Sequence, residues 1–255
     1  MIPKVIHYCW FGKGKLPPLA CKCIDSWRRI LPEYEIKLWN ENNFDVNSCQ
    51  YTKEAYGAKK FAFVTDYVRL YALFSEGGIY MDSDVEVLRP LDSFLSLPAF
   101  TGYETSNGCI TGLMGSEKGG VWVGDLLAEY VNRRFVLEDG RLDTTTNVVY
   151  TTNLMRRKGA IVDGHKIEMP GYVTIFPQDF FCPKSGASNQ ISLTENSYVI
   201  HHFAGSWVPK GARLAWVVRK KLGIRMGALV YYVLVEPKTL IKKIITWDIG
   251  KCVAN

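Results

Sequence analysis

Long apolar runs are missing from this sequence. No stretch reaches the roughly 18 apolar residues that a transmembrane helix needs, and residues 1–7, MIPKVIH, lack the basic region and apolar segment of a secretory signal. We therefore expect a chain that neither spans a membrane nor is translocated. Internal repeats and low-complexity tracts are also missing, which argues against a solenoid or fibrous protein.

Cysteine spacing typical of a metal or redox site is missing as well. The seven cysteines are an odd number, and the one close pair, Cys21 and Cys23, does not have the C-x-x-C spacing. The expectation is a set of reduced thiols in a cytoplasmic protein.

The composition is that of an ordinary globular protein, with 47% hydrophobic and 22% charged residues in a chain of 255. The net charge of +6 is unevenly distributed. Residues 208–255 hold ten Lys or Arg against Glu236 and Asp248, a net of +8, so residues 1–207 hold 21 basic and 23 acidic residues, a net of −2. We expect one principal domain over residues 1–207 and a basic helical appendage over residues 208–255, with no nucleic-acid partner.

The first elements predict a strand, a helix and a second strand. Lys4–Trp10 is apolar enough for a buried strand, Leu19–Leu31 has apolar positions near the helical period, and Tyr34–Trp39 alternates as a strand does. Such a β-α-β opening favours an α/β fold with a mostly parallel sheet and flanking helices. The other predicted elements are strands at Ala99–Tyr103, Cys109–Met114 and Tyr198–Phe203, helices at Val121–Phe135 and Asn147–Lys158, and a polar loop at Lys184–Ser197.

The strongest predicted helix, Lys59–Glu76, ends at Gly77-Gly78 and leads into a predicted strand over Ile79–Val87. That strand contains Asp82-Ser83-Asp84. Side chains two apart on a strand leave the same face, and paired carboxylates can hold a divalent cation that bridges the phosphates of a nucleotide. The alternative is a pair of solvated carboxylates.

Two further groups carry polar side chains in apolar surroundings. Asp66 and Arg69 share one face of the predicted helix, either as a ligand-binding pair or as a mutual ion pair. His201 and His202 lie in the last strand and point to opposite faces, so one of them can reach the site. Trp207 could donate its indole N–H to a phosphate or glycosidic oxygen, although a core tryptophan is the commoner case.

A family resemblance rests on three segments in this order: IPKVIHYCWFG, FVTDYVRLYALFSEGGIYMDSDVEVLRPLD and YVIHHFAGSW. Over residues 2–207 the chain resembles glycosyltransferase family 32, the capsular polysaccharide and mannosyltransferase-like enzymes with a D-x-D sugar-binding motif. More distantly it is similar to the clostridial glucosylating toxins. The resemblance implies a GT-A fold with a Rossmann-like sheet, Mn²⁺ or Mg²⁺ as cofactor, and sugar transfer with retention.

The resemblance also implies roles for particular residues. Asp84 and His202 are the expected metal ligands, with His201 as the substitute, and Asp82, Asp84 and Trp207 are the expected catalytic residues, Trp207 through a hydrogen bond to the leaving group. The expected donor-binding residues are Trp10, which stacks on the base, Asp66 and Arg69, which hold the sugar and phosphate, and Tyr80, Asp82 and Ser206.

The function implied is transfer of a hexose from a nucleotide-sugar, preferably a UDP-sugar, to a saccharide or lipid-linked oligosaccharide in capsule or surface polysaccharide synthesis. The basic tail suggests an enzyme placed peripherally on the inner face of the plasma membrane, at an anionic surface; the alternatives are a solvated helical face or a dimer contact. A non-catalytic nucleotide-sugar-binding module is the competing function. A haloacid dehalogenase-type phosphatase is disfavoured, because Val85-Glu86-Val87-Leu88 follows the carboxylates where that class has a small hydroxylic residue.

Overall fold

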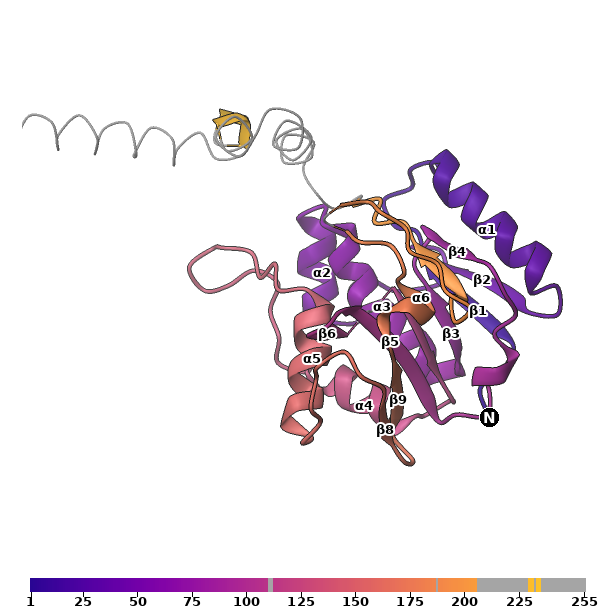
Figure 1. Ribbon diagram of the computed structural model, residues 1–255. Helices are drawn as coiled ribbons and strands as arrows, with labels where there is room; N and C mark the ends of the chain where they lie inside the picture. The colour runs from indigo at the N-terminus through magenta and orange to yellow at the C-terminus, as the bar shows by residue number, and fades with distance from the viewer. Residues whose placement is uncertain (110–111, 187, 206–228, 232, 235–255) are drawn as a thin grey trace, which may run out of the picture. The chain divides into compact units, whose positions relative to one another are not determined.

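The structure, a computed structural model, describes residues 1–109, 112–186, 188–205, 229–231 and 233–234. Met1–Ala204 form one compact unit, a central sheet with helices on both faces (Figure 1). The predicted basic appendage, residues 208–255, lies almost wholly outside the described residues; those of it that are described, 229–231 and 233–234, are helical. The domain boundary at residue 207 therefore stays a prediction.

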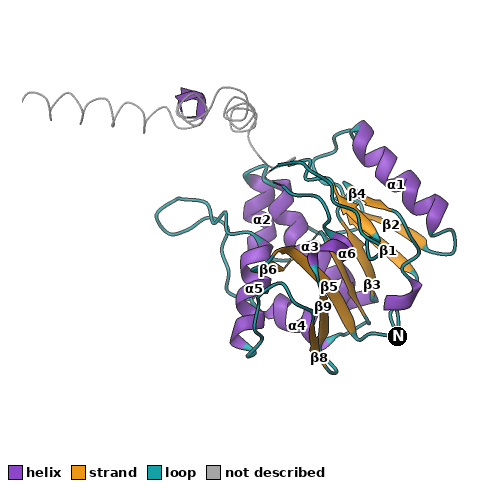
Figure 2. Ribbon diagram, viewed as in Figure 1, coloured by secondary structure: helices purple, strands orange, loops and turns teal. Residues whose placement is uncertain are grey.

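The unit alternates strands and helices along the chain (Figure 2). The strands are β1 Val5–Cys9, β2 Glu35–Trp39, β3 Gly78–Met81, β4 Val85–Val87, β5 Ala99–Thr105, β6 Gly108–Cys109, β7 Leu113–Ser116, β8 Ile167–Met169, β9 Val173–Phe176 and β10 Val199–His201. The helices are α1 Pro18–Ile30, α2 Gln50–Gly57, α3 Phe61–Glu76, α4 Val121–Ala128, α5 Asn147–Arg157 and α6 Gln178–Phe181, with a 3-10 turn, η1, at Asp92–Phe94.

The main sheet has the strand order β2-β1-β3-β7-β5-β9-β8, and β6 pairs with β5. The pairs β1–β2, β1–β3 and β5–β9 are parallel, whereas β7 is antiparallel to both β3 and β5, and β8 is antiparallel to β9. Strands β2, β1, β3, β5 and β9 therefore point the same way. This confirms the predicted α/β class, with a Rossmann-like, mostly parallel sheet and flanking helices.

The predicted strand Ile79–Val87 is in fact two strands in two sheets. Strand β3 belongs to the main sheet and β4 pairs antiparallel with β10 in a separate two-stranded sheet. Asp82, Ser83 and Asp84 form the turn between them, in which the Val85 amide donates to the Asp82 carbonyl at 2.9 Å. The carboxylates therefore lie on a turn at the carboxyl end of β3, not along a continuous strand.

The glycine pair after α3 allows the chain to reverse into β3. Gly77 and Gly78 have φ of +73° and +116°, a region that side chains with a Cβ rarely adopt. A Cβ on Gly78 would lie 2.6 Å from the carbonyl oxygen of Val5 in β1. Glycine is therefore required both for the turn and for the close approach of β3 to β1.

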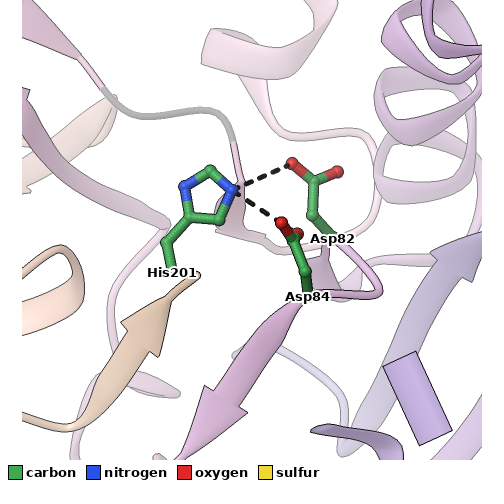
Figure 3. A group of neighbouring side chains, drawn as sticks. All are labelled: Asp82, Asp84 and His201. Carbon is green, nitrogen blue, oxygen red and sulfur yellow. Dashed lines mark ion pairs between the residues drawn. The ribbon is translucent and has the colours of Figure 1, made fainter. Parts of the chain in front are cut away.

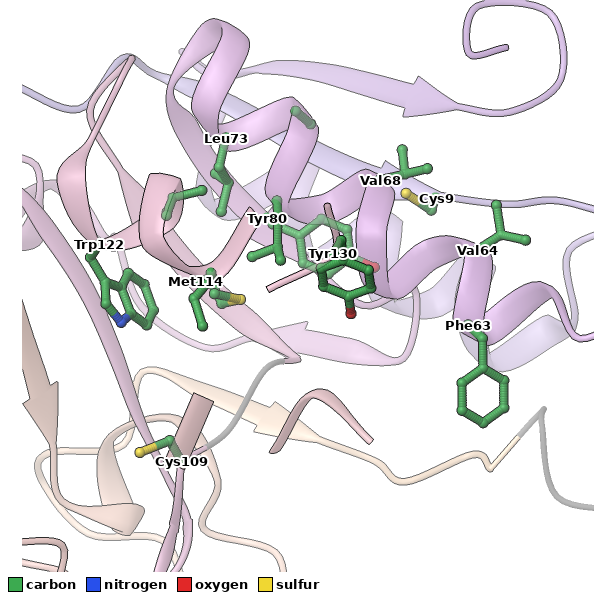
Figure 4. Close-up of a cluster of buried hydrophobic side chains, with 14 of the residues drawn as sticks. Cys9, Phe63, Val64, Val68, Leu73, Tyr80, Cys109, Met114, Trp122 and Tyr130 are labelled. Carbon is green, nitrogen blue, oxygen red and sulfur yellow. The ribbon is translucent and has the colours of Figure 1, made fainter. Parts of the chain in front are cut away.

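Two hydrophobic clusters lie on opposite faces of the sheet, because alternate side chains of one strand join different clusters. In β3, Ile79 and Met81 pack with α1, η1 and α6, whereas Tyr80 packs with α2, α3, α4 and α5. The cluster that contains Tyr80 also includes Val64, Val68 and Leu73 of α3, Met114 of β7, Trp122 of α4 and Tyr130 (Figure 4).

Other predictions differ from the structure as well. The single strand expected over Cys109–Met114 is divided between β6 and β7. The helix expected over Val121–Phe135 ends at Ala128, and beyond it the amides of Phe135 and Val136 donate to the Glu54 carboxylate instead of to helix carbonyls. Helix α2 and strands β8 and β9 were not predicted, since they are short or weakly periodic. None of the helices within the described part of the chain has the length and apolar character needed to cross a membrane.

Helix α1 is fastened to β4 through Trp27. Its indole N–H donates to the Val85 carbonyl at 2.7 Å, its side chain is fully buried, and its ring meets Tyr8 edge-on at 5.6 Å. The side chain hydroxyl of Ser26 accepts a hydrogen bond from the Val87 amide. Helix α1 therefore supports the strand that directly follows the carboxylate turn.

We predict that Trp27→Ala lowers the free energy of unfolding by about 3–5 kcal/mol, because it removes a large buried ring and leaves a cavity. Ile161→Ala, at a side chain that is 78% exposed, is the control and should change it by less than about 0.5 kcal/mol. Denaturant unfolding measures both. Equal stability of the two variants would contradict the proposed role of Trp27.

Candidate active site

The turn between β3 and β4 carries two of the site's acidic side chains. The Asp82 amide donates to the Gly112 carbonyl at 2.8 Å, which fixes the turn against the segment that enters β7. The side chains of Asp82 and Asp84 are 27% and 14% exposed. Both carboxylates are therefore accessible from solvent while their backbone is held in place.

His201, at the end of β10, faces the same turn (Figure 3). Its Nε2 lies 3.5 Å from Asp84 Oδ1 and 4.0 Å from Asp82 Oδ2. Antiparallel pairing places His201 opposite Val85, one residue after the turn. Residues separated by more than a hundred positions in the sequence thus form one cluster, with one ligand atom from each residue within 4.8 Å of the others.

The structure brings His201, and not the favoured His202, to the two carboxylates. His202 points to the other face of β10, where its Nε2 lies 2.8 Å from Glu86 Oε2, and Lys22 pairs with the same carboxylate oxygen at 3.0 Å. The structure therefore places the alternative, His201, beside the carboxylates and His202 away from them, and the metal-ligand role itself stays a prediction. The physical reason is strand alternation combined with the register of β10 against β4.

Opposite charges stabilise the Asp84–His201 pair. Burial would raise the pKa of Asp84, but hydrogen bonding and charge from His201, together with the Ala204 amide at 2.7 Å, lower the pKa to about 2. Burial would lower the pKa of His201, but the neighbouring carboxylates raise it well above its ordinary value. The imidazolium thus takes the position that a cation can occupy.

On the other side of Asp82 lies the buried guanidinium of Arg69, from α3. Its Nη2 is 3.0 Å from Asp66 Oδ1 and 3.4 Å from Asp82 Oδ1. Tyr80 donates its hydroxyl to Asp82 Oδ1 at 2.8 Å, and the Arg69 guanidinium lies over the Tyr80 ring at 4.6 Å. The structure therefore joins four of the predicted donor-binding residues in one network.

Asp66 is the most buried carboxylate of this network. Burial raises its pKa to about 6, against the lowering effect of Arg69. Its backbone carbonyl accepts a hydrogen bond from the Asn147 side chain at 2.9 Å, which fixes the start of α5 against α3. The structure shows the mutual ion pair, which also holds Asp82, and the ligand-binding role of Asp66 and Arg69 stays a prediction.

The remaining predicted residues are not brought into this network. Trp10, just after β1, is half-buried, and its indole N–H donates to the Gly14 carbonyl at 2.6 Å. Ser206 and Trp207 lie outside the described residues. The roles assigned to these three residues stay predictions.

The cluster of Asp82, Asp84 and His201 fits a divalent cation. Two carboxylate oxygens and one imidazole nitrogen are a suitable donor set for Mn²⁺ or Mg²⁺, with the imidazole favouring the softer ion. Three protein ligands leave further coordination positions for the oxygens of a diphosphate. A cation would take the place of the His201 proton, as metal binding to histidine requires.

Residues 17–101 match the family of glycosyltransferase sugar-binding regions that contain the DXD motif. The match covers about a third of the chain. The resemblance to glycosyltransferase family 32 is thereby confirmed over the segment that contains Asp66, Arg69, Tyr80 and the carboxylate turn.

The chain is also similar to individual proteins. The chain is 30% identical over 126 residues to inositol phosphoceramide mannosyltransferase 3 of Schizosaccharomyces pombe, covering 46% of this chain and 34% of the relative. It is 24% identical over 225 residues to an uncharacterized glycosyltransferase of Acanthamoeba polyphaga mimivirus, covering 82% and 85% of the two chains. The PaToxG glycosyltransferase structure aligns with 62% of this chain and 70% of its own, at 14% identity and a TM-score of 0.49. The chain thus spans about a third of the yeast relative's length.

Gly112 belongs to the DXD site, although no sequence signal singled it out. A Cβ at this position would lie 3.1 Å from Asp82 Oδ2 and 3.2 Å from His201 Cε1. The missing side chain therefore leaves room for Asp82 and His201 to approach one another.

We predict that Gly112→Ala weakens Mn²⁺ binding about 10-fold or more, since displacing the groups that orient metal ligands typically has such an effect. Gly57→Ala is the matched control, because a Cβ there meets no atom within 4 Å. Titration with Mn²⁺, followed by calorimetry or by the paramagnetic signal of the free ion, measures both. Unchanged affinity in Gly112→Ala would place the metal elsewhere.

Proposed function

We propose that this protein is a metal-dependent glycosyltransferase that moves a hexose from a nucleotide-sugar to a saccharide acceptor. The observation that carries the proposal is the meeting of Asp82, Asp84 and His201 at the carboxyl end of β3. In open α/β sheets, ligands bind at the carboxyl ends of the strands. The match of residues 17–101 to a sugar-binding family supports the same assignment.

The buried network next to this cluster suits the sugar portion of the donor. Arg69 is permanently charged and fixes Asp66 and Asp82, so the free oxygens of these carboxylates are held ready to accept hydrogen bonds from hydroxyl groups. A sugar offers several such donors on adjacent carbons. Preorganised acceptors reduce the entropy lost when the sugar binds.

Transfer requires that the leaving diphosphate be stabilised and the acceptor hydroxyl be positioned. A bound Mn²⁺ or Mg²⁺ supplies positive charge for the developing diphosphate. We infer retention by attack of the acceptor hydroxyl on the leaving-group face, with a diphosphate oxygen taking the proton. Asp82, held between Arg69 and the turn, would orient the sugar, and Trp207 would donate to the leaving group.

A UDP-sugar is the favoured donor, and a lipid-linked oligosaccharide of capsule or surface polysaccharide synthesis is the favoured acceptor. The basic residues 208–255, with a net charge of +8 from ten basic and two acidic residues, favour a position on the inner face of an anionic membrane. Two relatives are named as inositol phosphoceramide mannosyltransferases, names that include a lipid. Both points support a lipid-linked acceptor at a membrane surface.

The competing function is a nucleotide-sugar-binding module without turnover. It uses the same cluster and network, so the geometry of the donor site fits both functions. Consumption of the donor by the purified protein separates the two.

We predict that the wild type, with Mn²⁺, slowly hydrolyses one member of a panel of UDP- and GDP-sugars, and that Asp84→Asn lowers this rate at least about 100-fold because a charged ligand is lost. Asp25→Asn, at an exposed residue paired with Arg28, is the control and should retain the rate. Release of free nucleotide is the measurement. Nucleotide binding that depends on Mn²⁺ without hydrolysis would favour the binding module. The absence of both hydrolysis and Mn²⁺-dependent nucleotide binding would refute both functions.

We predict that removal of residues 208–255 abolishes sedimentation of the protein with vesicles containing anionic lipid, because each basic residue at such a surface contributes about 1 kcal/mol. Neutral vesicles are the control, and neither the full-length nor the truncated protein should sediment with them. Sedimentation that is unchanged after truncation would eliminate the membrane assignment of this segment.

A further inference from the structure

Glu104 lies at an irregularity near the end of β5. Tyr103 pairs with Cys109 and Thr105 pairs with Gly108, so Glu104 falls at a register shift between the two pairs. An extra residue of this kind is a β-bulge, which redirects a side chain and occurs often beside active sites. The direction of the Glu104 side chain is therefore set by the bulge and not by regular alternation.

The Glu104 carboxylate lies within electrostatic reach of the metal-site cluster. Burial raises the pKa of Glu104, while the charge of His201 lowers it and that of Asp82 raises it. Burial likewise raises the pKa of the Cys182 thiol, while the hydrogen bond and charge of His201 lower it and the charge of Glu104 raises it. Strand β5 runs parallel to β3 and is separated from it only by β7, so the end of β5 that carries Glu104 lies at the same edge of the sheet as the carboxylate turn.

No hydrogen bond or ion pair is formed by the Glu104 carboxylate within the described part of the chain, although the side chain is only partly exposed. A half-buried carboxylate without a donor is costly, because it has lost part of its hydration. It is also not one of the three residues whose ligand atoms converge. Its chemistry is therefore that of a hydrogen-bond acceptor beside the cation site.

We propose that Glu104 contacts the transferred sugar and accepts a hydrogen bond from one of its hydroxyl groups. This inference rests on the proposed function and adds a sugar-contact residue from β5. The nucleotide and its diphosphate belong to the cation cluster, whereas Glu104 lies on β5, beyond β7 from the carboxylate turn. Glu104 should therefore distinguish the complete donor from the free nucleotide.

The test compares two measurements in Glu104→Gln: the affinity for the free nucleoside diphosphate with Mn²⁺, and the kcat/KM for hydrolysis of the nucleotide-sugar that the wild type hydrolyses. The free nucleotide should bind within about twofold of wild type. The kcat/KM for donor hydrolysis should fall about 10- to 100-fold, as expected for loss of a charged hydrogen bond. Glu168→Gln, on the exposed edge strand β8, is the matched control and should show neither change.

The outcomes separate this inference from the proposed function. A wild type that hydrolyses its donor, together with a Glu104→Gln variant of full activity, would overturn the role of Glu104 and leave the glycosyltransferase intact. Equal losses for free nucleotide and nucleotide-sugar would also overturn it, since a structural role predicts that result. A wild type that neither binds Mn²⁺-nucleotide nor hydrolyses any donor would overturn both. Partial recovery in Glu104→Asp would support a carboxylate contact.

Discussion

Charge compensation around Asp82 is the constraint on which the rest of this site depends. Three carboxylates, those of Asp66, Asp82 and Asp84, gather at the end of β3, and like charges at such short range cannot remain together without cations. Arg69 supplies one cation from α3 and protonated His201 supplies the other from β10. The packing of α3 and the pairing of β10 with β4 are therefore both needed to hold the turn.

The two cations differ in a way that matters for function. Arg69 cannot lose its charge, so its contacts with Asp66 and Asp82 are permanent. His201 can lose its proton and become a metal ligand. On one side of Asp82, Arg69 therefore compensates the carboxylate charge permanently. On the other side, a divalent cation could replace the His201 proton, and the carboxylates would stay compensated.

Several parts of this arrangement followed from local sequence signals. The spacing of Asp66 and Arg69 placed both on one face of a helix, and the glycines after Glu76 predicted where that helix ends. The continuous strand predicted over Ile79–Val87 was wrong in detail, because β3 and β4 pair in different sheets. Short-range alternation contains no information about which partner each half of a segment will find.

The sequence by itself determined the α/β class, the D-x-D carboxylates and the match of residues 17–101 to a sugar-binding family. Only the tertiary structure decided between His201 and His202, because a one-residue shift of β10 against β4 would exchange their faces. It also brought Gly112 to the site and placed Glu104 at the same edge of the sheet. Their roles depend on close approach between distant strands, which is decided by long-range pairing and by a bulge, and neither leaves a local pattern in the sequence.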